Sequence, residues 1–232
     1  MHQFGPNIWI ADGPEVDFYG FPYPTRMVVI KLTDGSAWIW SPIELQDDGL
    51  LAAEVEEKVG PVRHIVSPNK IHHLSLASWA RRFPEARVYA PPGLEGRKCV
   101  EDVVFYGSLG DDADTTYRDD IDQVVFRGSC FMEEVAFFHR KSRTAILCDI
   151  VQRFPSEKVM GWKGWMMRMD DVVGPGGSTP REWRLSFCCG KRHARAAREK
   201  VLSWSPDSLV IAHGVCAREG ATDIISRALA WI

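Results

Sequence analysis

The amino-acid sequence predicts an α/β protein of the α+β type, in which two β-sheets pack face to face and helices cover them. Two observations favour this fold class. Each half of the chain places several apolar strand-like segments before its helical segments, whereas strict strand–helix alternation would predict one doubly wound parallel sheet. No linker-like stretch separates the halves. We therefore expect residues 1–232 to form one domain.

Composition and charge narrow the classes of partner. The 232 residues are 45% hydrophobic and 25% charged, with a net charge of −3, which is ordinary for a globular protein and gives no electrostatic reason to bind nucleic acid. No apolar run approaches the roughly 20 residues of a membrane span, and the first residues lack the pattern of a secretory signal. None of the six cysteines lies in a C-x-x-C motif. We expect a cytoplasmic protein with free thiols and no membrane contact.

Apolar runs and turn residues define the elements of the first half. An Asp-Gly pair at Asp34 predicts a β-hairpin, Gly60 is placed to end a helix, and Asp12–Thr25, rich in Gly and Pro, is expected to be an ordered loop. The expected strands are Asn7–Ala11, Met27–Leu32, Ala37–Trp40, Val62–Val66 and Ala86–Ala90, and the expected helices are Gln46–Val59 and Leu74–Phe83.

The second half repeats this style after an acidic segment, Glu101–Asp122, whose spacing does not fit a calcium loop. We expect Thr179 with Pro180, and later Thr222, to cap helices, and the Trp- and Met-rich residues 160–169 to be core in preference to a lid over a pocket. The expected strands are Gln123–Phe126, Val135–His139, Thr144–Cys148 and Leu209–Ala212, and the expected helices are Val159–Met169, Arg181–Ser203 and one after Thr222.

Three strand ends carry candidate metal ligands. The loop S-P-N-K-I-H-H after Val62–Val66 holds His72 and His73, Asp149 follows the strand ending at Cys148, and His213 follows the last strand. Histidine and carboxylate ligands from three strand ends suit zinc, iron or manganese. Each residue also has a structural alternative, as a cap, a turn residue or a buried histidine, and both interpretations stay open here.

The sequence resembles the metallo-β-lactamase superfamily, a four-layer αββα sandwich with a H-x-H-x-D-H motif after a strand. S-P-N-K-I-H-H-L looks like a degraded form of that motif, R-T-A-I-L-C-D-I like the strand that ends in a bridging Asp, and V-I-A-H-G like the last ligand motif. Over nearly the whole chain, F-P-E-A-R-V-Y-A-P-P-G-L and E-E-V-A-F-F-H-R-K-S-R-T add a resemblance to an uncharacterised family of this fold, known as a domain of unknown function.

The resemblance implies that one of the superfamily's two metal positions is erased. Pro68 and Lys70 stand where the first two histidines are expected, and Ser129 stands about where a Gly-His ligand would be; we assign Lys70 and Ser129 to substrate binding. The other position keeps the expected metal ligands, with His73 favoured over His72, and Asp149 doubles as the catalytic residue. These ligands are His72, His73, Asp149 and His213.

Two functions of different classes follow from this interpretation. The leading hypothesis is a mononuclear metal-dependent hydrolase of ester, lactone, thioester or phosphoester substrates, with one divalent cation and a small-molecule substrate, an anionic one included. The alternative is an inactive member of the fold, without a metal, that binds a small molecule or a protein. The sequence leaves the substrate, the metal and the oligomeric state open.

Overall fold

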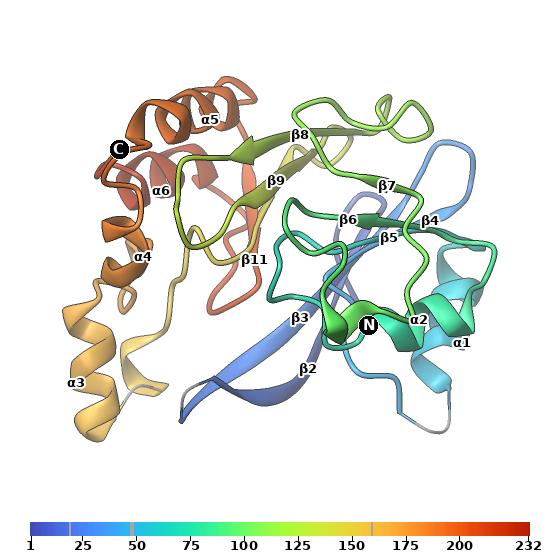
Figure 1. Cartoon of the computed structure of the whole chain (residues 1–232), viewed down its shortest axis with the longest axis horizontal. Coiled ribbons are helices and arrows are strands. Elements are labelled where there is room, and N and C mark those ends of the chain that lie inside the picture. The colour runs from blue at the N-terminus through green and yellow to red at the C-terminus, as the bar shows by residue number, and fades with distance from the viewer. Residues whose placement is uncertain (19, 47–48, 159) are drawn as a thin grey trace.

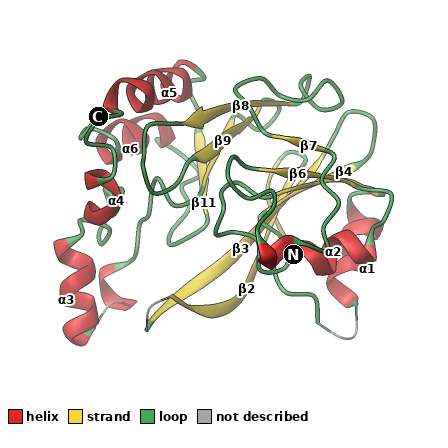
Figure 2. Ribbon diagram, viewed as in Figure 1, coloured by secondary structure: helices red, strands yellow, loops and turns green. Residues whose placement is uncertain are grey.

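Two β-sheets stack face to face in the structure, and helices cover the outer face of each (Figure 1). The structure, a computed structural model, describes residues 1–18, 20–46, 49–158 and 160–232. The predicted αββα sandwich is therefore confirmed (Figure 2). Within the described residues, no helix is both long and apolar enough to cross a bilayer.

The first sheet has seven strands in sequential order, with antiparallel pairing from β1 to β4 and parallel pairing from β4 to β7. The loop T-D-G-S joins β3 to β4, as its Asp-Gly pair predicts, and Gly35 adopts a φ of 84° there. The strands are β1 His2–Gly5, β2 Ile8–Phe18, β3 Phe21–Lys31, β4 Ala37–Trp40, β5 Val62–Val66, β6 Arg87–Ala90 and β7 Gly107–Ser108.

The second sheet has four strands in the order β11-β10-β9-β8, and β10 and β11 run parallel. This parallel pair brings the ends of two strands to the same edge of the sheet, which matters for the site below. The strands are β8 Ile121–Phe126, β9 Glu134–His139, β10 Thr144–Leu147 and β11 Ser208–Ile211.

Helices lie outside both sheets: α1 and α2 cover the seven-stranded sheet, and α5 and α6 cover the four-stranded sheet (Figure 1). The predicted helix Gln46–Val59 corresponds to α1, which begins at Leu50, and its residues 47–48 lie outside the described part of the chain. The helices are α1 Leu50–Lys58, α2 Leu76–Arg82, α3 Gly161–Met169, α4 Arg181–Leu185, α5 Lys191–Ser203 and α6 Ala221–Ala228, with short 3-10 turns at Lys98–Val100 and Ser156–Lys158.

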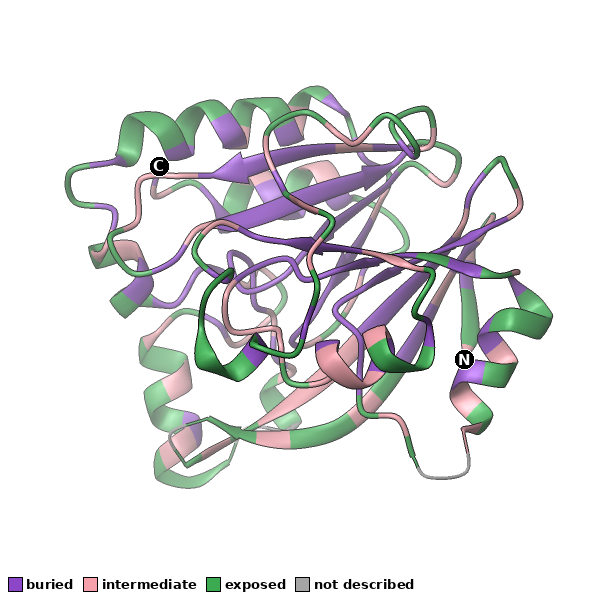
Figure 3. Cartoon of the chain, turned by 45° about the vertical axis from the view of Figure 1, so that its right-hand side comes forward, coloured by how far each residue is buried: buried purple, intermediate pink, exposed green. Residues whose placement is uncertain are grey.

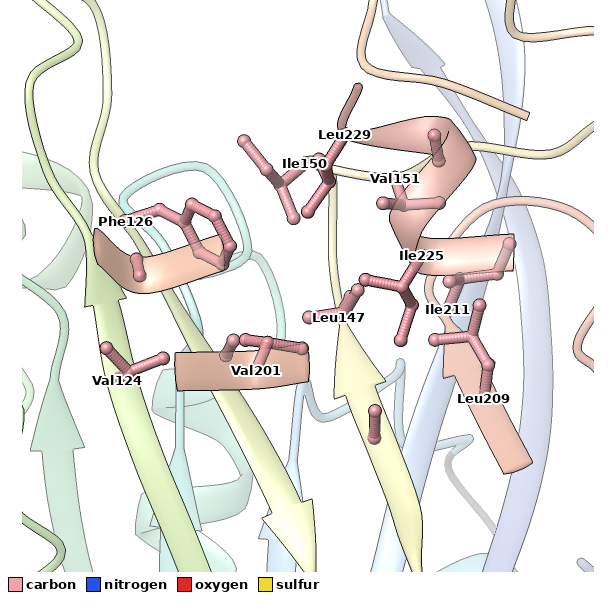
Figure 4. Packing of buried hydrophobic residues seen from close by; sticks show 14 of the residues in the cluster. Val124, Phe126, Leu147, Ile150, Val151, Val201, Leu209, Ile211, Ile225 and Leu229 are labelled. Atoms are coloured by element: carbon pink, nitrogen blue, oxygen red, sulfur yellow. The ribbon is translucent and has the colours of Figure 1, made fainter. Parts of the chain in front are cut away.

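Alternating side chains along the strands build three apolar layers. On β4, Trp38 and Trp40 point between the sheets, whereas Ala37 and Ile39 point toward α1 and α2. The four-stranded sheet faces α5 and α6 with a third layer, in which Leu147 and Ile225 pack together (Figure 4). The central strands are accordingly buried on both faces, whereas the outer part of the β2–β3 hairpin and the outer sides of the helices are largely exposed (Figure 3).

The segment Asp12–Thr25 is a long β-hairpin, so the predicted loop is wrong. β2 and β3 stay paired to their tip, with Glu15 opposite Pro24 and Asp17 opposite Pro22, and the register shifts between Asp12 and Glu15. Prolines cannot donate to a ladder and usually signal loops. They are tolerated here because this part of the hairpin extends beyond the neighbouring strands β1 and β4, which pair only with residues 8–10 and 28–31.

The predicted helix Arg181–Ser203 is two helices, α4 and α5, with a break over residues 186–190. Gly190 at this break lies against the backbone of Gly128, where an added Cβ would stand 2.1 Å from the Gly128 carbonyl oxygen. The close approach of these two backbones takes the chain out of the helical path and requires glycine.

The predicted threonine caps are also wrong. Thr179 donates its hydroxyl hydrogen to the Ile150 carbonyl oxygen at 2.5 Å, and Thr222 donates to the Pro206 carbonyl oxygen at 2.9 Å. Gly220, with a φ of 69°, precedes the first residue of α6 in place of a side-chain cap. Both hydroxyls therefore tie loops to one another instead of satisfying helix termini.

The Trp- and Met-rich segment is exposed, so its prediction as core is wrong. Trp162 and Trp165 are 66% and 61% exposed, and Met160 is 80% exposed. Met167 on the opposite side of α3 packs against Phe154 and Val172. The vicinal pair Cys188–Cys189 is exposed as well, and all six cysteines are free thiols as expected.

His64 on β5 makes folding stability depend on pH. Its ring is buried, stacks on Tyr89 and meets the edge of Tyr117. Burial first, and then the charge of Arg87, lowers the pKa of His64 to about 4 from an ordinary 6.5. Above pH 6.5 the ring is neutral in both states and its titration contributes nothing; as the pH falls toward 4, only the unfolded chain takes up the proton.

We expect this single residue to lower the free energy of unfolding by about 3 kcal/mol between pH 6.5 and pH 4. Urea unfolding at a series of pH values measures the slope, and His64→Phe should flatten it in that window. His193→Gln, on the exposed side of α5, serves as the matched control. A slope unchanged by His64→Phe would contradict the assignment.

Candidate metal centre

Three strand ends deliver side chains to one point between the sheets. His72 lies in the turn that follows β5, while Asp149 and His213 each lie two residues beyond the ends of β10 and β11. The parallel pairing of Leu147 with Ile211 places Asp149 and His213 side by side at the same sheet edge. The fold itself therefore positions these three residues together.

Two imidazole nitrogens and the carboxylate group of Asp149 form a small triangle. His72 Nε2 lies 3.3 Å from Asp149 Oδ2, His213 Nε2 lies 3.1 Å from Asp149 Oδ1, and the two Nε2 atoms lie 3.3 Å apart. Ligands at bond lengths of about 2.0–2.1 Å around a tetrahedral zinc ion lie about 3.3 Å from one another. The three separations are thus of the size found between neighbouring ligands in such a shell, with a different carboxylate oxygen facing each imidazole, and the residues fit a single divalent cation.

Hydrogen bonds at the far nitrogens orient both imidazoles. His213 Nδ1 donates to the Pro24 carbonyl oxygen at 2.8 Å, which directs Nε2 toward Asp149. His72 Nδ1 lies 2.8 Å from the Ser41 hydroxyl oxygen, which holds its ring in the same sense. Tyr23 meets His213 edge-on at 4.9 Å between ring centres. Outer partners of this kind fix which nitrogen of a metal-binding histidine is free to bind.

Asp149 is held as a carboxylate. Asn69 donates to its Oδ2 at 2.8 Å and Gln152 donates to its Oδ1 at 3.2 Å. Burial would raise the pKa of Asp149, but the charges and hydrogen bonds of His72 and His213 outweigh burial and hold that pKa well below its usual range. An ionised carboxylate between two imidazoles is the charge arrangement that a cation requires.

A second buried acid, Glu134 on β9, shapes the loop that carries Asp149. Its carboxylate accepts the backbone N–H groups of Cys148, Asp149 and Ile150 at 2.8, 2.7 and 3.1 Å, and its Oε2 lies 3.3 Å from Asn69 Nδ2. Burial first and then the Asp149 charge raise the pKa of Glu134 to about 8. Glu134 therefore positions Asp149 by binding the backbone of the loop that carries it.

Sequence reasoning missed Asn69, Glu134 and Gln152. Asn69 lies inside the motif that was singled out, where its Oδ1 accepts the N–H groups of Ile71 and His72 and shapes the turn. Glu134 opens an otherwise apolar strand, and a charged residue at such a position is the one signal that could have drawn attention to it. Gln152 carried no such signal.

A pocket of about 500 Å³ opens onto the three candidate ligands. Its walls come from the β2–β3 hairpin, the segment after β4 and the turn around His72. Besides His72, Asp149 and His213, the lining consists of Pro14, Val16, Asp17, Phe18, Tyr23, Thr25, Ser41, Pro42, Ile43, Glu44, Ile71, His73, Leu74 and Ser75. A cation bound by the triangle would face this space.

His73, the neighbour of His72 in the sequence, does not join the cluster of candidate ligands. His73 lines the pocket, but its Nδ1 lies 3.1 Å from the Lys70 carbonyl oxygen, and its ring is outside the His72–Asp149–His213 cluster. Burial first lowers the pKa of His73, which favours the neutral ring. The sequence preference for His73 over His72 is thus opposite to the arrangement in the fold.

Lys70 and Ser129, assigned to substrate binding from the sequence, do not line the pocket. Lys70 Nζ donates to the Phe131 carbonyl oxygen and lies 4.9 Å from the centre of the Phe131 ring. Ser129 Oγ accepts the indole N–H of Trp183 and the backbone N–H groups of Phe131 and Met132. Both side chains are engaged in holding loops, so neither supplies a group to the cluster.

The fold is that of the metallo-β-lactamases, and the cluster lies at the edge of its inner sheets. The chain is similar to DIM-1 metallo-β-lactamase at 15% identity and a TM-score of 0.67, covering 99% of this chain and 95% of that one. It is similar to a metallo-β-lactamase from Pontibacter korlensis at 11% identity and a TM-score of 0.61, covering 97% of this chain and 94% of that one. It is also similar to a metal-soaked Flv1 flavodiiron core from Synechocystis sp. PCC6803, at 10% identity and a TM-score of 0.63. That match covers 99% of this chain and 60% of the other.

The chain belongs to the family described as domain of unknown function DUF4336, whose sequence model matches residues 7–161. The predicted resemblance to an uncharacterised family of this fold is therefore confirmed. The matched range includes His72 and Asp149, and His213 lies beyond it. No curated protein matches the sequence.

Proposed function

We propose that residues 1–232 act as a single metallo-β-lactamase-like domain with hydrolase activity that depends on one divalent cation. His72, Asp149 and His213 would hold the cation. The observation that carries this proposal is the triangle of two imidazole nitrogens and a carboxylate, with sides of 3.1–3.3 Å, facing a pocket of about 500 Å³.

The chemistry of the donor set supports a catalytic site in preference to a structural one. Two histidines and one carboxylate are three protein ligands, whereas structural zinc sites have four, so a coordination position stays open. The same set serves iron(II) as well as zinc, and manganese accepts the oxygen ligand. Zinc, iron and manganese are accordingly the candidates.

Each group of the site has a role in such a reaction. A bound cation acts as a Lewis acid that lowers the pKa of water toward neutrality. Asp149 is ionised, so it can also accept a proton from a water molecule in the pocket. Ser41 and the Pro24 carbonyl oxygen keep the imidazole rings in place, and the apolar walls exclude bulk water from the substrate. The substrates we propose are carboxylic esters, lactones, thioesters or phosphoesters.

Metal dependence of turnover tests the proposal. The protein is treated with a chelator, reloaded with zinc, iron(II) or manganese, and assayed on a panel of p-nitrophenyl esters, a lactone, a thioester and a phosphodiester. We expect chelation to lower turnover of at least one substrate by about 100-fold or more, and one metal to restore it.

Two outcomes would contradict the proposal. Turnover that survives complete removal of metal would exclude a metal-dependent reaction at this site. Stoichiometric metal binding without turnover of any ester class, or no metal binding at all, would favour the binding-module alternative.

A further inference from the structure

The pocket beside the candidate metal centre has walls that are mostly apolar. No lysine or arginine lines it within the described part of the chain. The apolar contributions come from the hairpin, from the segment after β4 and from the turn after β5; they are Pro14, Val16, Phe18, Tyr23, Pro42, Ile43, Ile71 and Leu74. Such walls favour a ligand that buries apolar surface.

Two carboxylates lie on the exposed side of the same pocket. Asp17, near the tip of the hairpin, accepts the backbone N–H of Gly20 at 3.0 Å, and Glu44 follows the apolar segment after β4. Neither carboxylate forms an ion pair with another described residue. These two carboxylates therefore present negative charge to a ligand that enters the pocket.

Basic side chains of the β2–β3 hairpin, of α3 and of the turn after β5 form bonds elsewhere. Arg26 bonds Asp12 and the Ile211 and Gly214 carbonyl oxygens, and Lys163 on α3 donates to the Gly20 carbonyl oxygen. Lys70 is held by Phe131, as described above. An anionic ligand in the pocket would thus meet carboxylates without a cation side chain to offset them.

We propose that this pocket selects an uncharged, largely apolar ester or lactone and rejects substrates that carry an anionic group. The inference rests on the proposed function and narrows it, because phosphoesters and other anions drop out of the substrate list. The inference also replaces the expectation from the sequence that the substrate can be anionic. Asp17 and Glu44 are the residues that set this specificity.

The same charges assist the release of product. Hydrolysis adds water across the acyl C–O bond, which breaks to give a carboxylic acid and an alcohol. The acid loses its proton at neutral pH, because carboxyl groups titrate at a pH of about 4. A neutral substrate thus becomes an anion in the pocket, where the carboxylates of Asp17 and Glu44 repel it.

Binding of two matched probes tests this selectivity without any need for turnover. Methyl 2-naphthoate is neutral, and 2-naphthoate has the same ring system with a free carboxylate. Calorimetric titration of the full-length protein in chelating buffer removes the effect of a cation. We expect the neutral probe to bind at least about tenfold more tightly, because two carboxylates and no lysine or arginine line the described pocket.

Variants without these charges test whether Asp17 and Glu44 cause the preference for the neutral probe. The double variant Asp17→Asn/Glu44→Gln should reduce the preference to about threefold or less, because the walls stay apolar while the repulsion falls. Glu15→Gln/Glu57→Gln removes the same formal charge from exposed positions outside the lining and should leave the preference unchanged. Salt should narrow the wild-type ratio, since it screens exposed charges.

Several results would overturn the inference. These are tighter binding of 2-naphthoate, no binding of either probe at millimolar concentration, or an unchanged ratio in Asp17→Asn/Glu44→Gln. The proposed hydrolase fails separately, if metal-loaded protein turns over no ester while the neutral probe keeps its advantage. In a working enzyme, p-nitrophenyl butyrate should exceed its hemisuccinate analogue in kcat/KM by a similar factor.

Discussion

Replacing His72 with alanine is expected to lower the affinity for zinc by about 100-fold or more, because the loss of an outer partner alone costs 10–100-fold. His72 Nε2 is one of three donor atoms in the triangle, and its removal leaves only Asp149 and His213. Calorimetric titration of zinc into chelator-treated protein, together with metal analysis after dialysis, measures the change. Thermal unfolding of the metal-free variant confirms that the fold is retained.

The adjacent His73 provides a matched control. His73→Ala deletes the same side chain from the same turn, but its ring lies outside the cluster and bonds the Lys70 carbonyl oxygen. We expect its zinc affinity to stay within about threefold of the wild type, because only a neighbouring contact is lost. Equal losses in both variants, or a larger loss in His73→Ala, would contradict the ligand assignment made from the structure.

Replacing Glu134 with alanine is expected to lower the free energy of unfolding by about 4 kcal/mol, because three buried backbone N–H groups lose their acceptor at about 1–3 kcal/mol each and water enters in part. These N–H groups belong to Cys148, Asp149 and Ile150, which turn the chain into the site. Glu134→Gln keeps one acceptor oxygen and should lose about half as much. Urea unfolding at pH 7 measures both.

The neighbouring Glu133 again supplies the control. It is partly exposed and precedes the strand, so Glu133→Ala should change the free energy of unfolding by less than about 0.5 kcal/mol. A loss below about 1 kcal/mol in Glu134→Ala would show that water replaces the carboxylate without cost. In that case Glu134 would not position Asp149.

The two buried acids, Glu134 and Asp149, have different partners and different roles in the site. Glu134 is surrounded by N–H donors of its own loop, whereas Asp149 faces the imidazoles and the pocket. The raised pKa of Glu134 and the lowered pKa of Asp149 follow from this division, since two adjacent buried carboxylates do not both ionise freely. The negative charge is thereby concentrated on the oxygen atoms that face the proposed cation.

Periodicity in the sequence determined most of the sandwich. The run Val62–Val66 is a strand with the predicted bounds, and the helix predicted after Thr222 forms, with apolar residues such as Ile224 and Ile225 buried. These predictions held because a segment buried on one side must repeat apolar residues at the spacing of its own geometry. The outer part of the hairpin, Asp12–Thr25, was missed because it is stabilised by strand pairing despite its prolines, and pairing partners are not local in sequence.

The sequence and the tertiary structure also determined different features of the candidate site. By itself, the sequence determined that His72, His73, Asp149 and His213 follow strands, and its resemblance to the superfamily motif led to the proposal that one metal position is altered. The choice of His72 over His73, the roles of Asn69 and Glu134, and the charge of the pocket emerged only from the tertiary structure. Adjacent histidines carry the same chemistry, and only the turn geometry that Asn69 imposes decides which imidazole reaches Asp149, 77 residues further along the chain.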